Sequence, residues 1–349
     1  MVMKRFQPAI RITTALAAVL FLALSTGCNP NDPLAIHEFP QGDGIDPTKV
    51  KLHLKYTFDL DIETFKTITP LQSPTRAAGL QMDARCVVEV NRVTGKDSKL
   101  VTRYVASKAQ MTEAVTAFDT VLMLNAAKYK IAVWVDYVDH GTLSDKYFKT
   151  ESLSAVTLNR NPYGAGNDDQ DAFSGVFDID LTPYAKQWNM SVDYQGQLLR
   201  PQAKIVVITT DVDEYLTRLG TRATDISSFT ARISYQSNIP RVYSDYSGNP
   251  TDVVTGVGFT SNLQALSATE ALMSTDYVLV NNQESEVSFN MDVMDQAGDV
   301  VKSIPITAPI ARGKMTVIRG NFLTGNYNSP ITIDPDFDKD KEQNIHIPD

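Results

Sequence analysis

The chain has 349 residues, of which 43% are hydrophobic and 21% charged, and its formal net charge is −9. This composition is typical of a globular protein with a sizeable core. The acidity argues against nucleic-acid binding and against docking on anionic lipid through a basic face, because both need positive charge.

The first 27 residues are predicted to be a secretory signal. They hold three basic residues and no acid, and 12–24 is almost wholly apolar but shorter than the roughly 20 residues of a spanning helix. The following run Leu-Ser-Thr-Gly-Cys resembles a bacterial lipobox, with Ser25 where a large aliphatic residue is usual. We expect cleavage before Cys28 and acylation of its thiol, which removes the three positive charges and leaves a net charge of −12. Plain secretion and an uncleaved anchor are the alternatives.

Residues 28–48 are rich in Pro, Gly, Asn and Asp and are predicted to be a tether between the lipid and the first domain. If Cys28 is acylated, Cys86 has no partner for a disulfide. Cys86 lies in an apolar-rich strand candidate, so we expect a buried, inert thiol.

The sequence from residue 49 onward predicts short strands separated by turns. Residues 50–58 alternate strictly between apolar and polar side chains, the pattern of a half-buried antiparallel strand. In 128–137, Trp134 lies opposite the main apolar face, so both faces of that strand are expected to be covered. The other predicted strands are 84–93, 99–105, 118–124, 150–158, 173–181, 190–199, 204–209, 229–235, 277–280, 285–294, 300–307 and 314–318.

One short helix is predicted over 211–219. Asp211 would be its N-cap, Glu214 the capping-box partner three residues later, and Gly220 the C-terminal stop. Many short strands with a single helix predict an all-β protein of two tandem β-sandwich domains. We place the N-terminal domain at 49–199 and the C-terminal domain at 200–349.

No catalytic motif is visible in the sequence. The four histidines are not spaced as metal pairs, and neither His-Glu-x-x-His nor Gly-x-Ser-x-Gly occurs. We therefore predict that the protein is not an enzyme and needs no cofactor. A pair of carboxylates that meet in space for glycoside hydrolysis is the alternative that sequence leaves open.

Two acidic clusters are weak calcium candidates. The first follows Asn167 and contains Asp168, Asp169 and Asp171. The second has alternating aspartates, as a calcium loop does, but lacks the Gly and the distant Glu of that pattern. Its candidate ligands are Asp334, Asp336 and Asp338. For both clusters the alternative is a solvated turn.

Four aromatic residues are candidates for a sugar-stacking platform. They are Trp134, Tyr137, Tyr163 and Trp188. The alternative for each is a core or half-buried strand position.

Several runs together resemble a family of Bacteroidales lipoproteins related to fimbrillins, which includes minor subunits that anchor a fimbria to the outer membrane. Besides the lipobox, these runs are KYKIAVWVDYVD at 128–139, DAFSG at 171–175, RPQAKIVVITTDVDEYL at 200–216, TDYVLVN at 275–281, and GNFLTG and ITIDPDFD within 320–338. The resemblance implies two transthyretin-like Greek-key sandwiches. It also implies subunits that join by β-strand addition, and no catalytic residues.

The predicted function is a non-enzymatic surface lipoprotein at the cell outer membrane, anchored through lipid such as palmitate on Cys28. It would act as a fimbrillin-like structural or adhesion subunit, with other such subunits as partners and no nucleic acid or small-molecule cofactor. The short run 344–347 is a candidate strand to be donated or received. The alternative function is a glycan-binding surface lipoprotein.

Overall fold

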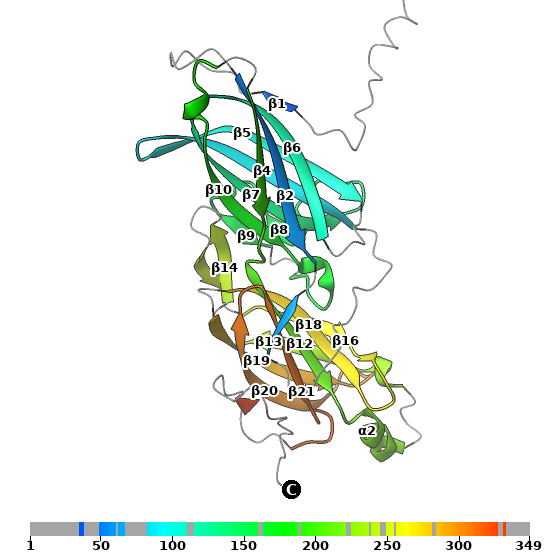
Figure 1. Ribbon diagram of the computed structural model, residues 1–349. Coiled ribbons are helices and arrows are strands. Elements are labelled where there is room, and N and C mark those ends of the chain that lie inside the picture. The colour runs from blue at the N-terminus through cyan, green and yellow to red at the C-terminus, as the bar shows by residue number, and fades with distance from the viewer. Residues whose placement is uncertain are drawn as a thin grey trace, which may run out of the picture. The chain divides into compact units, whose positions relative to one another are not determined.

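The computed structural model describes residues 35–37, 49–60, 62–66, 82–109, 115–159, 163–187, 190–220, 225–236, 239–244, 249–254, 256–280, 284–326 and 331–332. These residues form five β-sheets, with one α-helix and three short 3₁₀ helices between the strands (Figure 1). The predicted all-β fold is confirmed. No helix in the described ranges has the length and apolarity needed to cross a membrane.

Two four-stranded sheets are built mainly from the first half of the chain. The first has the order β1-β6-β2-β11, and the second has the order β10-β7-β4-β5. The strands of the first sheet are β1 (Ala35–His37), β2 (Lys49–Asp59), β6 (Val115–Asn125) and β11 (Ser191–Gln197). Those of the second are β4 (Met82–Thr94), β5 (Asp97–Ala109), β7 (Lys128–Asp139) and β10 (Phe173–Asp180).

These two sheets pack face to face through alternating side chains. In β2 burial alternates along the whole strand, as predicted, because one face meets the core and the other does not. Phe58 of β2 lies 4.4 Å from Phe173 of β10 between ring centroids, and Tyr56 stacks on Phe177 at 5.6 Å. The first half of the chain therefore has the two-layer core of a sandwich.

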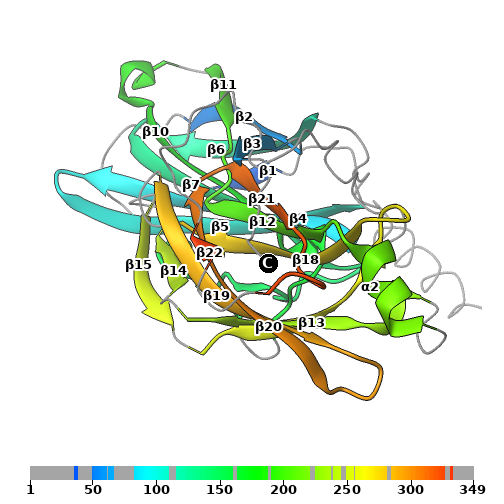
Figure 2. The ribbon, with the colours of Figure 1, turned by 90° about the horizontal axis from the view of Figure 1, so that it is seen from below.

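Two five-stranded sheets are built mainly from the second half. Their orders are β17-β18-β12-β21-β3 and β16-β13-β19-β20-β22. The strands of the first are β3 (Glu63–Lys66), β12 (Gln202–Thr209), β17 (Gln264–Ala265), β18 (Ala271–Leu279) and β21 (Lys314–Gly320). Those of the second are β13 (Thr230–Tyr235), β16 (Gly258–Asn262), β19 (Glu284–Met294), β20 (Val300–Ala311) and β22 (Ile331–Thr332). Figure 2 shows β19 and β20 as one long hairpin.

A fifth sheet, of order β15-β14-β9-β8, combines segments that are distant in sequence. Its strands are β8 (Phe148–Lys149), β9 (Val156–Leu158), β14 (Ile239–Ser244) and β15 (Asn249–Val254). Here β9 pairs with β14, and in the sheet that contains β12, β3 pairs with β21. Both pairings join the two predicted domain ranges, whose boundaries stay a prediction.

Helix α2 (Val212–Leu219) occurs where it was predicted, but the predicted capping box is wrong. Asp211 is the N-cap residue and Gly220 ends the helix with a φ of 65°, yet the Asp211 side chain makes no cap hydrogen bond. Its carboxylate instead accepts from the Thr209 hydroxyl at 2.5 Å and from the Thr324 amide at 2.6 Å. It thus fixes the chain after β21 to the end of β12.

Replacing Asp211 by alanine is expected to lower the free energy of unfolding by about 3 kcal/mol, because amides of the segment after β21 lose a buried charged acceptor. Glu214→Ala is the matched control. Among the described residues, Glu214 pairs with the exposed Arg218 one turn later, so its loss is expected to stay within about 0.5 kcal/mol. Urea titration of both variants checks this, and equal losses would show that the Asp211 carboxylate does not hold the segment after β21.

Candidate functional site

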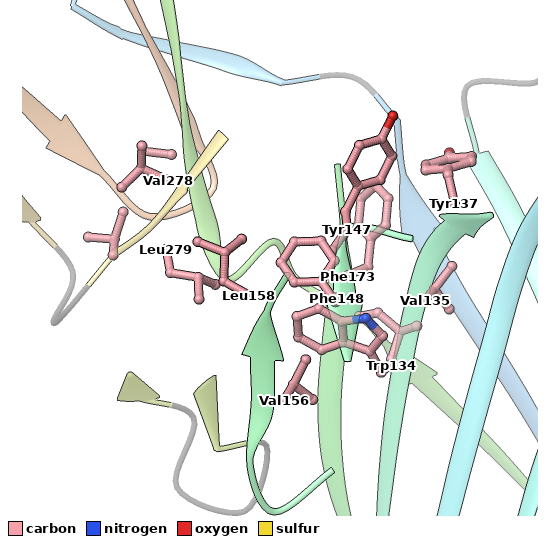
Figure 3. Packing of buried hydrophobic residues seen from close by; sticks show 14 of the residues in the cluster. Trp134, Val135, Tyr137, Tyr147, Phe148, Val156, Leu158, Phe173, Val278 and Leu279 are labelled. Carbon is pink, nitrogen blue, oxygen red and sulfur yellow. The ribbon is translucent and has the colours of Figure 1, made fainter. Parts of the chain in front are cut away.

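Two of the aromatic candidates, Trp134 and Tyr137, lie in the core, with 0% and 1% of their surface exposed. Trp134 meets Phe148 edge to face, with 5.2 Å between ring centroids, and Figure 3 shows the two rings side by side. A ring without an exposed face has no surface for a sugar, so neither residue forms a stacking platform in this structure. The same contact confirms that both faces of this strand are covered.

Tyr163 is half-buried, and its hydroxyl donates to both oxygens of Asp276, at 3.1 and 3.0 Å. The fourth aromatic candidate, Trp188, lies outside the described residues. So do the predicted lipidation site Cys28, the tail run 344–347 and the calcium candidates, which are Asp334, Asp336 and Asp338.

Asp276 of β18 is the centre of a buried polar cluster. Besides Tyr163, the hydroxyl of Tyr235 donates to it at 2.5 Å, and the amide of Tyr277 donates at 2.8 Å. The Gln170 carboxamide nitrogen, in its best-satisfied orientation, also donates to Asp276 at 2.8 Å. Burial raises the pKa of Asp276 to about 7, against an ordinary value of 3.8, because the loss of water around the carboxylate outweighs the hydrogen bonds that it accepts.

The acidic segment after Asn167 is fixed by cations of the chain. Asp168 accepts from Lys204 at 2.7 Å, and Asp171 accepts from Arg200 at 2.9 Å. These carboxylates therefore hold the segment against the start of β12 rather than converging on one point. Within the described ranges, no three His, Cys, Asp or Glu side chains are grouped to hold a metal ion.

A second buried charged group lies under the segment that follows β7. Arg85 of β4 forms a two-pronged pair with Asp136 of β7, at 2.9 and 2.6 Å, and the two side chains are 2% and 1% exposed. A third bond of 2.7 Å runs from Arg85 to Asp145, and Arg85 also donates to the Leu143 carbonyl. The guanidinium therefore links two strands to the covering segment.

Cys86 is buried and free. Burial raises the pKa of its thiol, which keeps it protonated and a poor nucleophile. It has the environment expected of an inert core thiol.

The described feature that best suits binding of another chain is the outer edge of β5. This strand of 13 residues contains no proline and pairs with β4 along its length, while no other described strand pairs with its far side. Its start, 97–100, is exposed. Arg103, a cation that could guard the edge, is turned to Glu89 at 2.7 Å and to the Thr150 carbonyl.

Sequence comparison assigns the family. Residues 47–348 match the profile of DUF6562, a family of unknown function. The chain belongs to this family. No curated protein matches the DUF6562 chain in sequence.

Solved structures similar to this DUF6562 protein include the fimbrial anchor protein Mfa2 from Porphyromonas gingivalis. The identity is 10%, 73% of this chain and 81% of that chain are covered, and the TM-score is 0.38. A candidate adhesin from Bacteroides ovatus has 17% identity, coverage of 73% and 77%, and a TM-score of 0.39. A candidate polysaccharide-binding protein from Bacteroides thetaiotaomicron has 9% identity, coverage of 73% and 80%, and a TM-score of 0.40.

Proposed function

We propose that this DUF6562 protein is a non-enzymatic adhesion or fimbrial subunit of the cell surface, held in the outer membrane by lipid on Cys28. It joins its partners by β-strand addition, in which main-chain hydrogen bonds provide the attraction and alternating side chains set the register. The lipobox-like run before Cys28 supports the anchor.

The β5 edge is the observation that carries strand addition. An edge strand this long, without proline, exposes a row of backbone donors and acceptors that another strand can pair with. Soluble proteins normally blunt such edges, and here Arg103 is committed to partners within the chain. The β5 edge is therefore the proposed acceptor for a partner strand.

The first experiment is a pull-down from the outer membrane of the native host. The bait carries a tag after Asp349 and is eluted without boiling. Partners that resist detergent and separate only on heating are expected. Cys28→Ser is expected to release the protein from the membrane fraction. A bait recovered alone, wherever the tag is placed, would contradict the assembly.

Neighbouring proline substitutions in β5 locate the partner. Ala106 and Ser107 are adjacent, so the backbone of one faces β4 and that of the other faces outward. The variant whose replaced backbone N–H faces β4, either Ala106→Pro or Ser107→Pro, is expected to lower the melting temperature. The outward one is expected to leave stability nearly unchanged and to abolish co-purification. Retention of the partner by both variants would place strand addition elsewhere.

A further inference from the structure

The second long edge strand, β20, is bordered very differently on its two sides. On one side it pairs with β19 from Ala311 back to Val300. On the other side, among the described residues, β22 pairs with it in parallel at Ile306 and Thr307 alone. On this side, the strand of 12 residues is thus paired with a strand of two residues.

Two hydrogen bonds show which backbone groups of β20 face away from β19. The amide of Gln236 donates to the carbonyl of Ser288 at 2.8 Å, so Ser288 directs its backbone to β13, and Thr307 opposite it must face outward. Independently, the hydroxyl of Thr316 in β21 donates to the Pro309 carbonyl at 2.8 Å, so Pro309 also faces outward.

Residues two apart in a strand direct their backbone groups to the same side. The outward positions of β20 are therefore Ser303, Pro305, Thr307, Pro309 and Ala311.

Proline has no N–H, so two of these five positions offer no donor. The amide of Thr307 is left between Pro305 and Pro309, and the next outward donors are four residues away on either side, or about 13 Å. An ordinary edge offers a donor at every second residue. The two residues of β22 are registered on Thr307 and its neighbour.

We propose that the outer edge of β20 binds the chain's own segment Ile331–Thr332 by strand pairing and does not accept a strand from another chain. A longer partner strand would place carbonyls against Pro305 and Pro309, where they find no donor. A two-residue strand centred on Thr307 meets the available amide and avoids both gaps. This inference holds whether or not the protein assembles through β5.

The test uses the full chain carrying Cys28→Ser, so that lipid does not cause association. Thr307→Pro removes the backbone N–H donor of residue 307. Thr307→Val keeps this donor and serves as the matched control. Thr307→Pro is expected to leave the melting temperature nearly unchanged and to raise the rate of proteolytic cleavage around 331–332 about tenfold or more. A large fall in melting temperature would show that this amide faces β19. Unchanged cleavage would show that the amide does not hold β22. Either result would overturn the proposal.

The converse variant, Pro305→Thr with Pro309→Thr, restores both donors. It is expected to associate in a concentration-dependent way in size-exclusion chromatography with light scattering, whereas the parent chain keeps one size. Association of the parent through β20, detected by cross-linking at Ser303→Cys, would refute the closed edge. So would an opened variant that stays monomeric. Loss of partners that bind the β5 edge is measured separately. Strand addition at β5 and the closed edge of β20 can therefore be refuted independently of each other.

Discussion

Asp276→Asn is expected to remove most of the dependence of stability on pH between about 4 and 7. The pKa of Asp276 is raised to about 7 in the folded protein, while in the unfolded chain it returns to its ordinary 3.8. Between these values the folded state holds a proton that the unfolded state has lost, so the free energy of unfolding falls as pH rises. The difference corresponds to about 4 kcal/mol, fully lost above pH 7.

The asparagine variant never carries the charge. It is therefore expected to match the parent below about pH 4, to exceed it by about 1–2 kcal/mol at pH 5 and to exceed it by about 4 kcal/mol at pH 8. The groups that face Asp276 are Tyr163, Tyr235, Gln170 and the Tyr277 amide, and burial raises the pKa of both tyrosine hydroxyls, which keeps them protonated as donors.

Denaturant titrations at pH 5, 6, 7 and 8 measure the effect of Asp276→Asn. Asp178→Asn is the control, since Asp178 is an exposed carboxylate on β10 that pairs with Lys130 at the surface. The control should follow the parent at every pH. If Asp276→Asn also follows the parent, the buried cluster does not govern the response to pH.

Asp136→Ala is expected to lower the free energy of unfolding by about 3–5 kcal/mol. It removes both hydrogen bonds of the bidentate ion pair with Arg85. The buried guanidinium then keeps its positive charge with less negative charge beside it. Asp145→Ala should cost less, because Asp145 is 28% exposed and makes a single bond to Arg85. Urea titration at constant pH checks both values.

The double variant Arg85→Met with Asp136→Leu separates the ion pair from the packing around it. Without a buried charge, it is expected to be more stable than Asp136→Ala alone. A double variant that is less stable than the single one would show that the guanidinium contacts with Leu143 and Asp145 matter more than the pair itself.

Strands with a clear local pattern were predictable from the sequence. Residues 50–58 alternate because one face of β2 packs on β10, and the apolar run 204–209 belongs to β12, which is buried along its whole length. The helix over 211–219 was predicted from its polar start and Gly220. The hydrogen-bond partner of Asp211 could not be predicted, because it lies more than a hundred residues away in sequence.

Features that depend on distant pairing had no local signal. Residues 63–66 contain one apolar side chain, Phe65, and none of the predicted strands includes them, yet they form β3 because β21 offers an edge to them. The aspartates after Asn167 suggested a calcium site because no cation lies beside them in sequence. Their partners, Lys204 and Arg200, follow some thirty residues later. The Asp276 cluster was missed because its two tyrosines come from separate segments.

The pairing of β3 with β21 also bears on how the chain reaches its native state. Glu63 and Lys314 form an ion pair although they are 251 positions apart in sequence. Closing so large a loop is entropically costly, and such non-local pairing belongs to the slow end of folding, milliseconds to seconds. The sheet around β12 stays incomplete until almost the whole chain has been made. A fragment ending at residue 200 would carry β3 without the strand it needs, so a recombinant first half should start after β3 or be co-expressed with the remainder.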